Sequence, residues 1–306
     1  GKADYIGYGG DTQITSIDAA MSLQRTNPDL NLWPYSYRAE TAMAFNTQIS
    51  PWNDIRVRRA IQMAIDLETI NRTYHKGWAN PTAAAALGDA MVGYVTPFEE
   101  WPEELKQYYR YDPERAEALL DAAGYQRGAD GYRFTLKLAH FSRWDETYPE
   151  IVMGYFDAIG VKSELEVLDT AEFGVAARAE PSEYGLLTSY YGYFGGPGLV
   201  GYTFGAVTKL LGDYSVNKMN DPRMDALYLA ARDAADLEEF KIIQRQADEL
   251  CVREHCGLVK SNIPNHFVNQ PWVQGYFGEA GMGWGERMTH LARIWIDSAL
   301  KEARGR

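Results

Sequence analysis

Several features that assign proteins to a class are scarce in this sequence. It has only two cysteines, no apolar run long enough to span a bilayer, and no leader with a basic start and a short apolar core. Positive charge is also scarce, since 30 Lys and Arg face 42 Asp and Glu and give a formal net charge of -12. Such a chain offers no basic face to nucleic acid or to an anionic membrane surface, so we expect neither as a partner.

Motifs of enzymes are missing as well. The sequence contains no GxSxG elbow, no HExxH, no P-loop and no GxGxxG that opens a helix. Asp and Glu are plentiful, but nothing in their order selects a pair for glycoside hydrolysis. The histidines are scattered without the spacing of metal ligands. We therefore expect no catalytic residues, no metal site and no cofactor.

Cys251 and Cys256 lie five positions apart at the predicted end of a helix. This spacing allows a local disulfide in an oxidising compartment, and it equally allows two separate buried thiols. A metal site that includes His255 is the third alternative, although no second pair of ligands stands nearby.

Three helix starts share one signature, an Asp followed by a run of helical periodicity. Asp54 precedes an apolar stripe at helical spacing, and Asp112 precedes Pro113 and a stripe that Gly124 ends. Asp221 opens a longer helical region that extends to residue 250, with a predicted break near residues 234–237. Between residues 134 and 168 the pattern is strand, helix, strand, which predicts a parallel βαβ unit and an α/β protein.

Two segments carry a resemblance to a known family. FNTQISPWNDIRVRRAIQMAIDLETI, residues 45–70, is followed by YDPERAEALLDAAGY, residues 111–125. In this order and separation they resemble the extracellular solute-binding proteins of family 5, receptors that supply peptides, nickel or oligosaccharides to ABC importers. The resemblance runs from GKADYI to the WID near the end but begins in the middle of the family pattern. The chain is thus expected to correspond to the C-terminal half of a two-lobed receptor.

The resemblance implies a fold and a domain layout. The fold is α/β, a periplasmic-binding-protein-like (type II) second lobe with the C-terminal part of the first lobe. Residues 1–48 are expected to be a remnant of the first lobe and a crossover, 49–257 the second lobe, and 258–306 the return to the first. It also implies the transmembrane subunits of an ABC permease as partners. The expected location is periplasmic or extracellular, with membrane association through the permease or through an N-terminal lipid anchor that is not in this chain.

The segment TSYYGYFGGPGLVGYTFG, residues 188–205, is the first candidate ligand surface. Glycines let a backbone approach a ligand closely, and aromatic rings offer flat faces with hydroxyl groups; the alternative is a loop with core-facing aromatics. In peptide-binding members of the family, the matching segment carries an aspartate a few residues before the proline. That aspartate pairs with the peptide's amino terminus. Tyr193 stands at that place here, before Pro197. The ligand-binding candidates in this segment are Tyr190, Tyr191, Tyr193 and Phe194.

A second candidate surface is HFSRWDE, residues 140–146, at the end of the first predicted strand of the βαβ unit. Ligands of open α/β sheets lie outside the carboxyl ends of strands, so Arg143 and Trp144 are predicted to contact a ligand. The alternative is a solvated loop in which the tryptophan packs locally. Arg56, Arg58 and Arg59 lie on a helix instead, where two are predicted to face solvent and the third to make a structural ion pair.

These patterns predict a fragment of the solute-binding component of an ABC importer. It would capture an oligosaccharide or an oligopeptide between two lobes and deliver it to the permease. The alternatives are a non-catalytic interaction module and a glycoside or peptide hydrolase.

Overall fold

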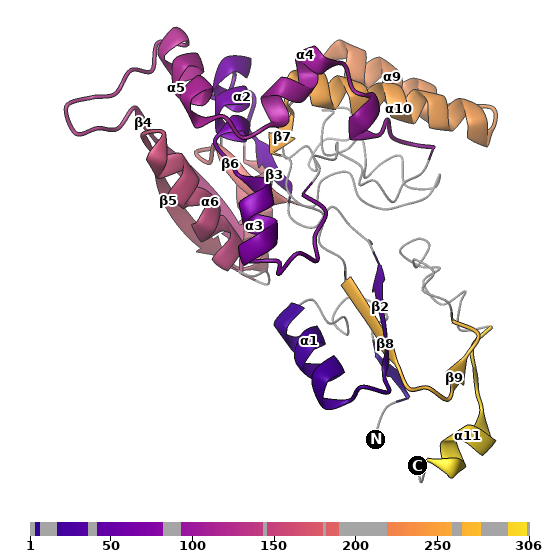
Figure 1. The fold of residues 1–306 in the computed structure, drawn as a ribbon. Coiled ribbons are helices and arrows are strands. Elements are labelled where there is room, and N and C mark those ends of the chain that lie inside the picture. Colours follow the sequence, from indigo (N-terminus) through magenta and orange to yellow (C-terminus); the bar gives the residue numbers. More distant parts are fainter. Residues whose placement is uncertain are drawn as a thin grey trace.

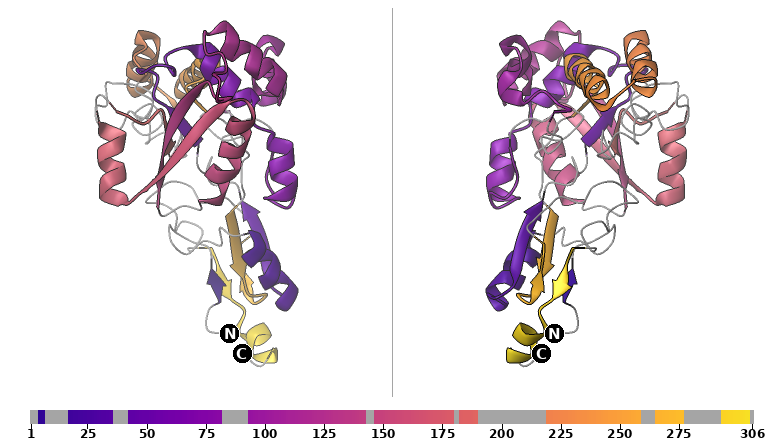
Figure 2. Two further views of the ribbon diagram at one scale, coloured as in Figure 1. Left: turned by 90° about the vertical axis from the view of Figure 1, so that its left-hand side faces the viewer. Right: turned by 90° about the vertical axis from the view of Figure 1, so that its right-hand side faces the viewer.

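The computed structural model describes residues 4–6, 17–35, 42–81, 93–142, 146–179, 182–189, 219–258, 265–276 and 293–304. They form a larger body around a five-stranded sheet and a smaller body around a three-stranded sheet (Figure 1). Both ends of the chain lie on the smaller body, on the side away from the larger one (Figure 2). The mixed helix and strand content confirms the predicted α/β architecture.

The strands of the larger body are β3 (Ala42–Phe45), β4 (Phe134–Phe141), β5 (Val161–Leu168), β6 (Leu186–Ser189) and β7 (Gly257–Leu258). Its helices are α2 (Ile55–Met63), α3 (Leu67–Thr73), α4 (Glu103–Lys106), α5 (Pro113–Ala122), α6 (Thr147–Ala158), α7 (Thr170–Arg178), α9 (Pro222–Arg232) and α10 (Leu237–Glu254), with the 3-10 turns η1 (Phe98–Glu100) and η2 (Gln107–Tyr109). The smaller body contains β1 (Tyr5–Ile6), α1 (Ile17–Thr26), β2 (Asn31–Tyr35), β8 (Asn265–Asn269), β9 (Val273–Gln274), β10 (Trp295–Ile296) and α11 (Ser298–Ala303).

The five-stranded sheet has the order β5-β4-β6-β3-β7. Strand β4 is parallel to both β5 and β6, whereas β3 is antiparallel to β6 and β7. In the smaller body β8 lies between β1 and β2 and is antiparallel to both, and β9 and β10 form a separate antiparallel pair.

Helices cover both faces of the larger sheet (Figure 2). On one face, Leu136, Leu138 and Leu186 pack into a buried cluster with residues of α2, α5 and α6. On the other face, Ala139 and Leu187 pack with α7, and Ala44 packs with α9 and α10. The larger body is therefore a three-layer α/β/α structure whose core lies on the two sides of one sheet.

The predicted helix boundaries are confirmed. The carboxylates of Asp54, Asp112 and Asp221 each accept a hydrogen bond from a backbone N–H of the first turn that follows. Gly124 adopts a φ of 92° just after α5, the left-handed conformation that a glycine stop requires. The predicted break in the long helical region falls between the end of α9 and the start of α10.

The predicted βαβ unit is also confirmed. Strands β4 and β5 pair in parallel along their whole length, from Phe134 opposite Val161 to Phe141 opposite Leu168, and α6 connects them. Gly160 precedes β5 with a φ of 79°, so the chain turns from helix to strand at a residue that tolerates this conformation.

The pairing of β3 bears on the predicted domain layout. Residues 1–48 were expected to be a remnant of the first lobe and a crossover, and within them β3 is hydrogen-bonded between β6 and β7 in the larger sheet. A division at residue 48 separates this strand from its neighbours. We propose that the first crossing lies between β2 and β3 and the second between β7 and β8, because the pairing partners of the chain change there.

Replacing Asp112 by Ala is expected to lower the free energy of unfolding by about 1 kcal/mol, because the first turn of α5 loses its side-chain acceptor. Urea unfolding followed by circular dichroism measures this loss. Exchanging Glu114, which lies in the same turn but is not the cap, for Gln serves as the control. Equal stability of the Asp112→Ala variant and the unaltered chain would contradict the assignment of Asp112 as a cap.

Candidate ligand-binding site

Four strand ends lie at one edge of the larger sheet. The carboxyl ends of β4 and β6 lie there, because the two strands are neighbours and parallel. The start of β3 lies there as well, since Ala42 is opposite Ser189, and so does the end of β7, since Leu258 is opposite Met43. The chain reaches β3 from β2 and leaves β7 for β8, so both connections to the smaller body leave from this edge (Figure 1).

At the same edge, the connections that follow two neighbouring strands run toward opposite sides of the sheet. From β4 the chain continues through α6 to β5 on one side, whereas from β6 it continues through α9 and α10 to β7 on the other side. Where the connections of two adjacent strands run in opposite directions, their carboxyl ends leave a crevice in which open α/β sheets bind ligands. The topology therefore places the candidate site at the ends of β4 and β6.

Both sequence-predicted ligand segments begin in the last residues of these two strands and continue beyond them. Residues 140–146 start in β4, and residues 188–205 start in β6. All the predicted ligand residues lie outside the described part of the chain, so their contacts stay predictions: Arg143, Trp144, Tyr190, Tyr191, Tyr193 and Phe194.

A fully buried threonine joins the ends of β4 and β6. The hydroxyl of Thr188 accepts a hydrogen bond from the backbone N–H of Phe141 at 3.1 Å and donates to the carbonyl of Ala139 at 3.4 Å. On the other side of β4, the backbone N–H of Ser142 donates to the carbonyl of Leu168 at 2.9 Å. Thr188 begins the candidate segment 188–205, but the sequence did not predict its contacts with β4, because a buried threonine at a strand end carries no signal that distinguishes it from an exposed one.

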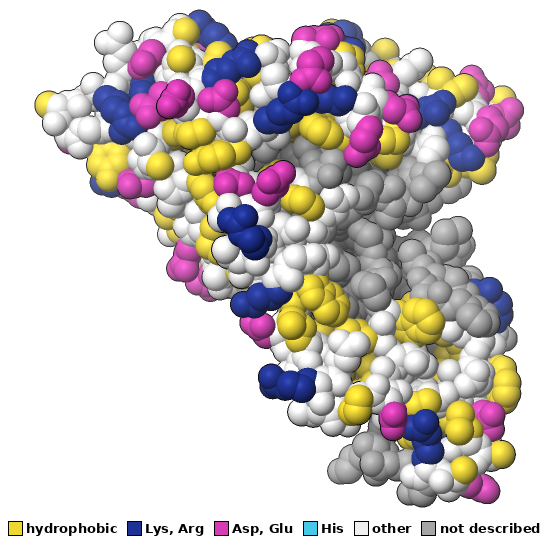
Figure 3. All heavy atoms as spheres, in the orientation of Figure 1, with side chains coloured by type: hydrophobic (Ala, Val, Ile, Leu, Met, Phe, Trp, Pro, Cys, Tyr) yellow, Lys and Arg dark blue, Asp and Glu magenta, His cyan; other side chains and the backbone are white. Residues whose placement is uncertain are grey.

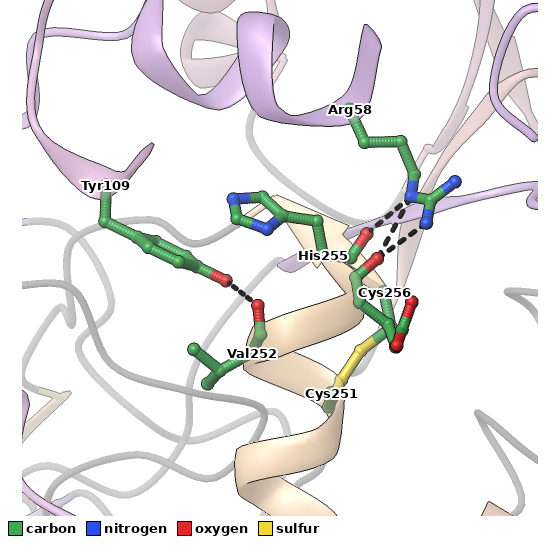
Figure 4. The surroundings of a disulfide bond; sticks show 7 residues. Arg58, Tyr109, Cys251, Val252, His255 and Cys256 are labelled. Carbon is green, nitrogen blue, oxygen red and sulfur yellow. Dashed lines mark hydrogen bonds between the residues drawn. A yellow bond between two sulfur atoms is a disulfide. The ribbon is translucent and has the colours of Figure 1, made fainter. Parts of the chain in front are cut away.

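A buried arginine fixes the end of α10, next to the second connection. The guanidinium of Arg58 donates to the carbonyl of Trp52 at 2.6 Å. It also donates to the carbonyls of Glu254 at 2.7 Å and His255 at 3.0 Å (Figure 4). The sequence predicted a structural ion pair for one arginine of this helix, and the hydrogen bonds from Arg58 to these carbonyl oxygens give that arginine a structural role. The residue ties α2 to the segment that enters β7, and it is 5% exposed, so its role is structural.

The other two arginines of α2 also contact the protein. Arg56 pairs with Asp54 at 2.6 Å and donates to the carbonyl of Ala122 at 2.7 Å. The guanidinium of Arg59 lies over the ring of Tyr108, 4.1 Å from its centre. These contacts support the interpretation that the arginine-rich helix is part of the scaffold.

Cys251 and Cys256 are joined in a disulfide whose Cα atoms are 5.2 Å apart, at the end of α10 (Figure 4). This selects the disulfide from the three alternatives considered for the two cysteines. Tyr109 donates from its hydroxyl to the carbonyl of Val252 at 2.8 Å in the same turn. Among the described residues no group of three or more His, Cys, Asp or Glu side chains is arranged to hold a metal ion.

His255 lies between the two cysteines in a left-handed backbone conformation, with a φ of 48°. Its buried ring stacks on Tyr109 with centres 4.4 Å apart. Burial, followed by the positive charges of Arg59 and Arg58, holds the pKa of His255 well below its usual range. The imidazole is therefore neutral at pH 7 and packs as an aromatic side chain.

A three-layer body connected twice to a second body, with both connections at the edge that carries the topological switch, is the arrangement of the periplasmic-binding-protein fold. The chain belongs to the bacterial extracellular solute-binding proteins of family 5: residues 1–202 match the family described as "Bacterial extracellular solute-binding proteins, family 5 Middle". This confirms the resemblance found in the sequence. The family consists of solute-binding proteins and not of enzymes, in agreement with the absence of catalytic motifs.

The chain is similar to heme-binding protein A of Haemophilus influenzae, with 25% identity over 264 residues that cover 84% of this chain and 45% of that protein. It is 24% identical over 151 residues to the glutathione-binding protein GsiB of Salmonella typhimurium, covering 49% of this chain and 27% of that protein. The chain thus spans less than half the length of these relatives.

Solved structures share the fold. HbpA2 from Haemophilus parasuis aligns with a TM-score of 0.73 and 20% identity over 97% of this chain and 54% of that chain. NikA from Brucella suis in complex with Fe(III)-EDTA aligns with a TM-score of 0.73 and 17% identity over 97% of this chain and 58% of that chain. In the described part of the present chain, no helix has the length and apolar character needed to cross a membrane.

Proposed function

We propose that this chain supplies one wall of a solute site in the binding component of an ABC importer. The observation that supports this most directly is the coincidence of three features at one sheet edge: the switch between β4 and β6, and the two connections to the smaller body. A ligand held at the switch lies where the two bodies meet, so their approach would enclose it.

The proposed mechanism is reversible capture without chemistry. A solute enters between the bodies, the two connections change their backbone angles, and the bodies close around it. The closed receptor is then recognised by the transmembrane subunits of the permease, outside the cytoplasm. Energy for transport comes from the ATPase subunits of the importer and not from this chain.

The proposed ligand is an oligosaccharide or an oligopeptide, and Tyr193 is the residue that separates them. A buried α-ammonium group needs a carboxylate partner, and a tyrosine carries no charge at neutral pH. A neutral solute with flat faces suits the aromatic segment 190–194. One relative is named for binding heme and the other for binding glutathione, which is peptide-like. A peptide is therefore retained as an equal candidate.

Replacing Trp144 or Tyr193 by Ala in the complete receptor is expected to weaken binding by about 1 to 3 kcal/mol each, the usual scale for the loss of a buried aromatic contact. Isothermal calorimetry with trialanine, N-acetyl-trialanine, cellotriose and hemin measures the affinities. Tyr111, a half-exposed tyrosine before α5, supplies the control, since Tyr111→Ala removes an aromatic ring away from this edge.

The ligand series separates the candidates. Binding of cellotriose with no binding of trialanine supports the oligosaccharide. If trialanine binds and N-acetyl-trialanine does not, the protein is a peptide receptor. The carboxylate that pairs with the peptide's amino terminus then belongs to the other lobe. Unchanged affinities in both aromatic variants, for a ligand that the unaltered receptor binds, would overturn the proposed site.

A further inference from the structure

We propose that Arg59 and Arg115, which both lie over the ring of Tyr108, form a binding site for a phosphate group on the larger body. The three residues belong to α2, α5 and η2, and none of them lies at the ends of β4 and β6. The proposal goes beyond the proposed function and does not depend on it, because it concerns a different part of the larger body.

Two guanidinium groups meet at one aromatic ring. The central carbon of Arg59 lies 4.1 Å from the centre of the Tyr108 ring, and that of Arg115 lies 5.4 Å from it. The two charges are therefore within about one Debye length of each other (~10 Å at 0.1 M salt), and they repel. In a chain with a net charge of -12 this is a local exception, and Lys and Arg side chains also lie together beside α4 (Figure 3).

Neither arginine is neutralised by a carboxylate in the described part of the chain. There, the only hydrogen bond from the side chain of Arg59 is a long one, 3.4 Å from its Nη2 to the carbonyl of Arg253, and the side chain of Arg115 makes none. The nearby carboxylate of Asp112 accepts from the backbone N–H of Arg115 and caps α5. Arginines elsewhere on the chain are paired with carboxylates, for example Arg56, Arg127, Arg223 and Arg304.

The charge of Arg59 is also costly to the protein. Its Nε is buried and has no hydrogen-bond acceptor among the described residues, and a buried donor of a charged group without an acceptor costs free energy. A guanidinium over a ring uses its face for that contact, so the N–H donors in its plane stay available. An anion at these donors would neutralise the charge.

Contacts between the surrounding segments hold the site in place. The backbone N–H of Asp112, just before α5, donates to the carbonyl of Met63 in α2 at 2.9 Å. The hydroxyl of Tyr109, next to Tyr108 in η2, donates to the carbonyl of Val252 in α10 at 2.8 Å. These segments are therefore joined before any ligand arrives, and binding would not have to order them.

Two positive charges favour a doubly charged ligand. A phosphate group carries a charge of about -1.5 to -2 at pH 7, and its oxygens accept paired hydrogen bonds from a guanidinium. A carboxylate carries a single charge and would balance only one of the two arginines. Inorganic phosphate and the phosphate monoester of a lipid headgroup offer the same chemistry, and the experiments below separate these two sources.

The first test is a titration of this chain with inorganic phosphate, followed by NMR of the arginine Nε–H signals. The signals of Arg59 and Arg115 are expected to shift and to saturate. The signal of Arg56 is the internal control and should not move, because its guanidinium is already paired with Asp54. Potassium chloride at equal ionic strength, and acetate, should produce no saturable shift, since their anions carry one charge.

The second test compares variants by the same titration. Arg115→Gln is expected to weaken phosphate binding about tenfold, because one of two charged donor groups is lost. Arg115 is exposed, so its replacement should leave the fold intact, and Arg59→Gln is the second variant. Arg115→Lys keeps the charge without the planar fork and should lie between. Arg56→Gln removes a positive charge from the same helix and should leave the affinity unchanged.

Cosedimentation with vesicles separates the two sources of phosphate. Binding to phosphatidylcholine vesicles that contain phosphatidic acid, absent without that lipid and lost in Arg115→Gln, assigns the site to a lipid headgroup. Saturable binding of inorganic phosphate without vesicle binding assigns it to the free anion.

Three results would overturn the proposal. The first is that neither inorganic phosphate nor the phosphatidic acid vesicles bind. The second is an equal loss of binding in Arg56→Gln and Arg115→Gln, which would show diffuse attraction by charge. The third is a response to acetate as strong as that to phosphate. Since trialanine, cellotriose and hemin probe the other site, none of these results decides the proposed function.

Discussion

Replacing Arg58 by Ala is expected to lower the free energy of unfolding of the larger body by about 3 to 5 kcal/mol. The guanidinium forms charge-assisted hydrogen bonds to three backbone carbonyls, from Trp52, Glu254 and His255. Each such bond contributes about 1.5 to 3 kcal/mol, and truncation leaves buried acceptors without a donor. The loss should appear in urea unfolding as a lower midpoint with an unchanged slope.

Arg56→Ala is the matched control for this prediction. The residue lies two positions away on the same helix, but its pair with Asp54 is solvent-exposed and is expected to contribute little. Arg58→Lys keeps the charge and loses the planar fork, so an intermediate stability is expected. Equal stability of Arg58→Ala and Arg56→Ala would show that the carbonyls around Arg58 find other donors at little cost.

Replacing Trp52 by Ala is expected to cost about 3 to 5 kcal/mol, the range for removing a large buried aromatic side chain. The ring is 2% exposed and stacks on Phe45 with centres 5.5 Å apart. It also packs edge to face with the ring of Phe134, with centres 5.8 Å apart. It also lies directly against Gly185, where an added Cβ would approach the indole nitrogen to 1.9 Å. The two residues therefore occupy space that neither can share with a larger neighbour.

A double-mutant cycle checks this arrangement. Gly185→Ala alone should destabilise the larger body by about 1 to 3 kcal/mol through overpacking. In the Trp52→Ala background the same change should cost little, because the cavity accepts the methyl group. Gly154→Ala is the control. Gly154 lies in the middle of α6, where an added Cβ would meet no atom within 4 Å, so this change should be neutral or stabilising. Additive effects of Trp52→Ala and Gly185→Ala would contradict direct packing of the pair.

The sequence predicted those parts of the fold that local signals determine. Asp112 with Pro113, and Gly124 eleven residues after that proline, mark the start and the end of one helix in a short window. The alternating residues of β4 and β5 identify a parallel unit because both strands and their helix lie within 35 residues of sequence. Such signals reflect the local backbone conformation and the alternation of buried and solvent-facing side chains. Residues that are close in the sequence are enough to encode both.

The anchors of the candidate site depend on partners that are distant in the sequence. Arg58 contacts His255 across 197 positions, and Thr188 contacts Phe141 across 47. No local pattern shows that an arginine on an amphipathic helix turns toward backbone carbonyls, or that a strand-end threonine bridges to another strand. The predicted domain division falls after β3 for the same reason. The strands that pair with β3 come far later in the chain, so the local sequence does not show which sheet β3 joins.

The pairing of β3 with β7 and of β2 with β8 joins residues more than two hundred positions apart. During synthesis on the ribosome, the βαβ unit of β4, α6 and β5 can form early, because its contacts are close in sequence and closing its loop costs little entropy. The edge strand β7 and the sheet of the smaller body must wait until the last part of the chain, residues 257–269, has emerged. Until then β2 and β3 each have an unpaired edge, which can pair with other chains.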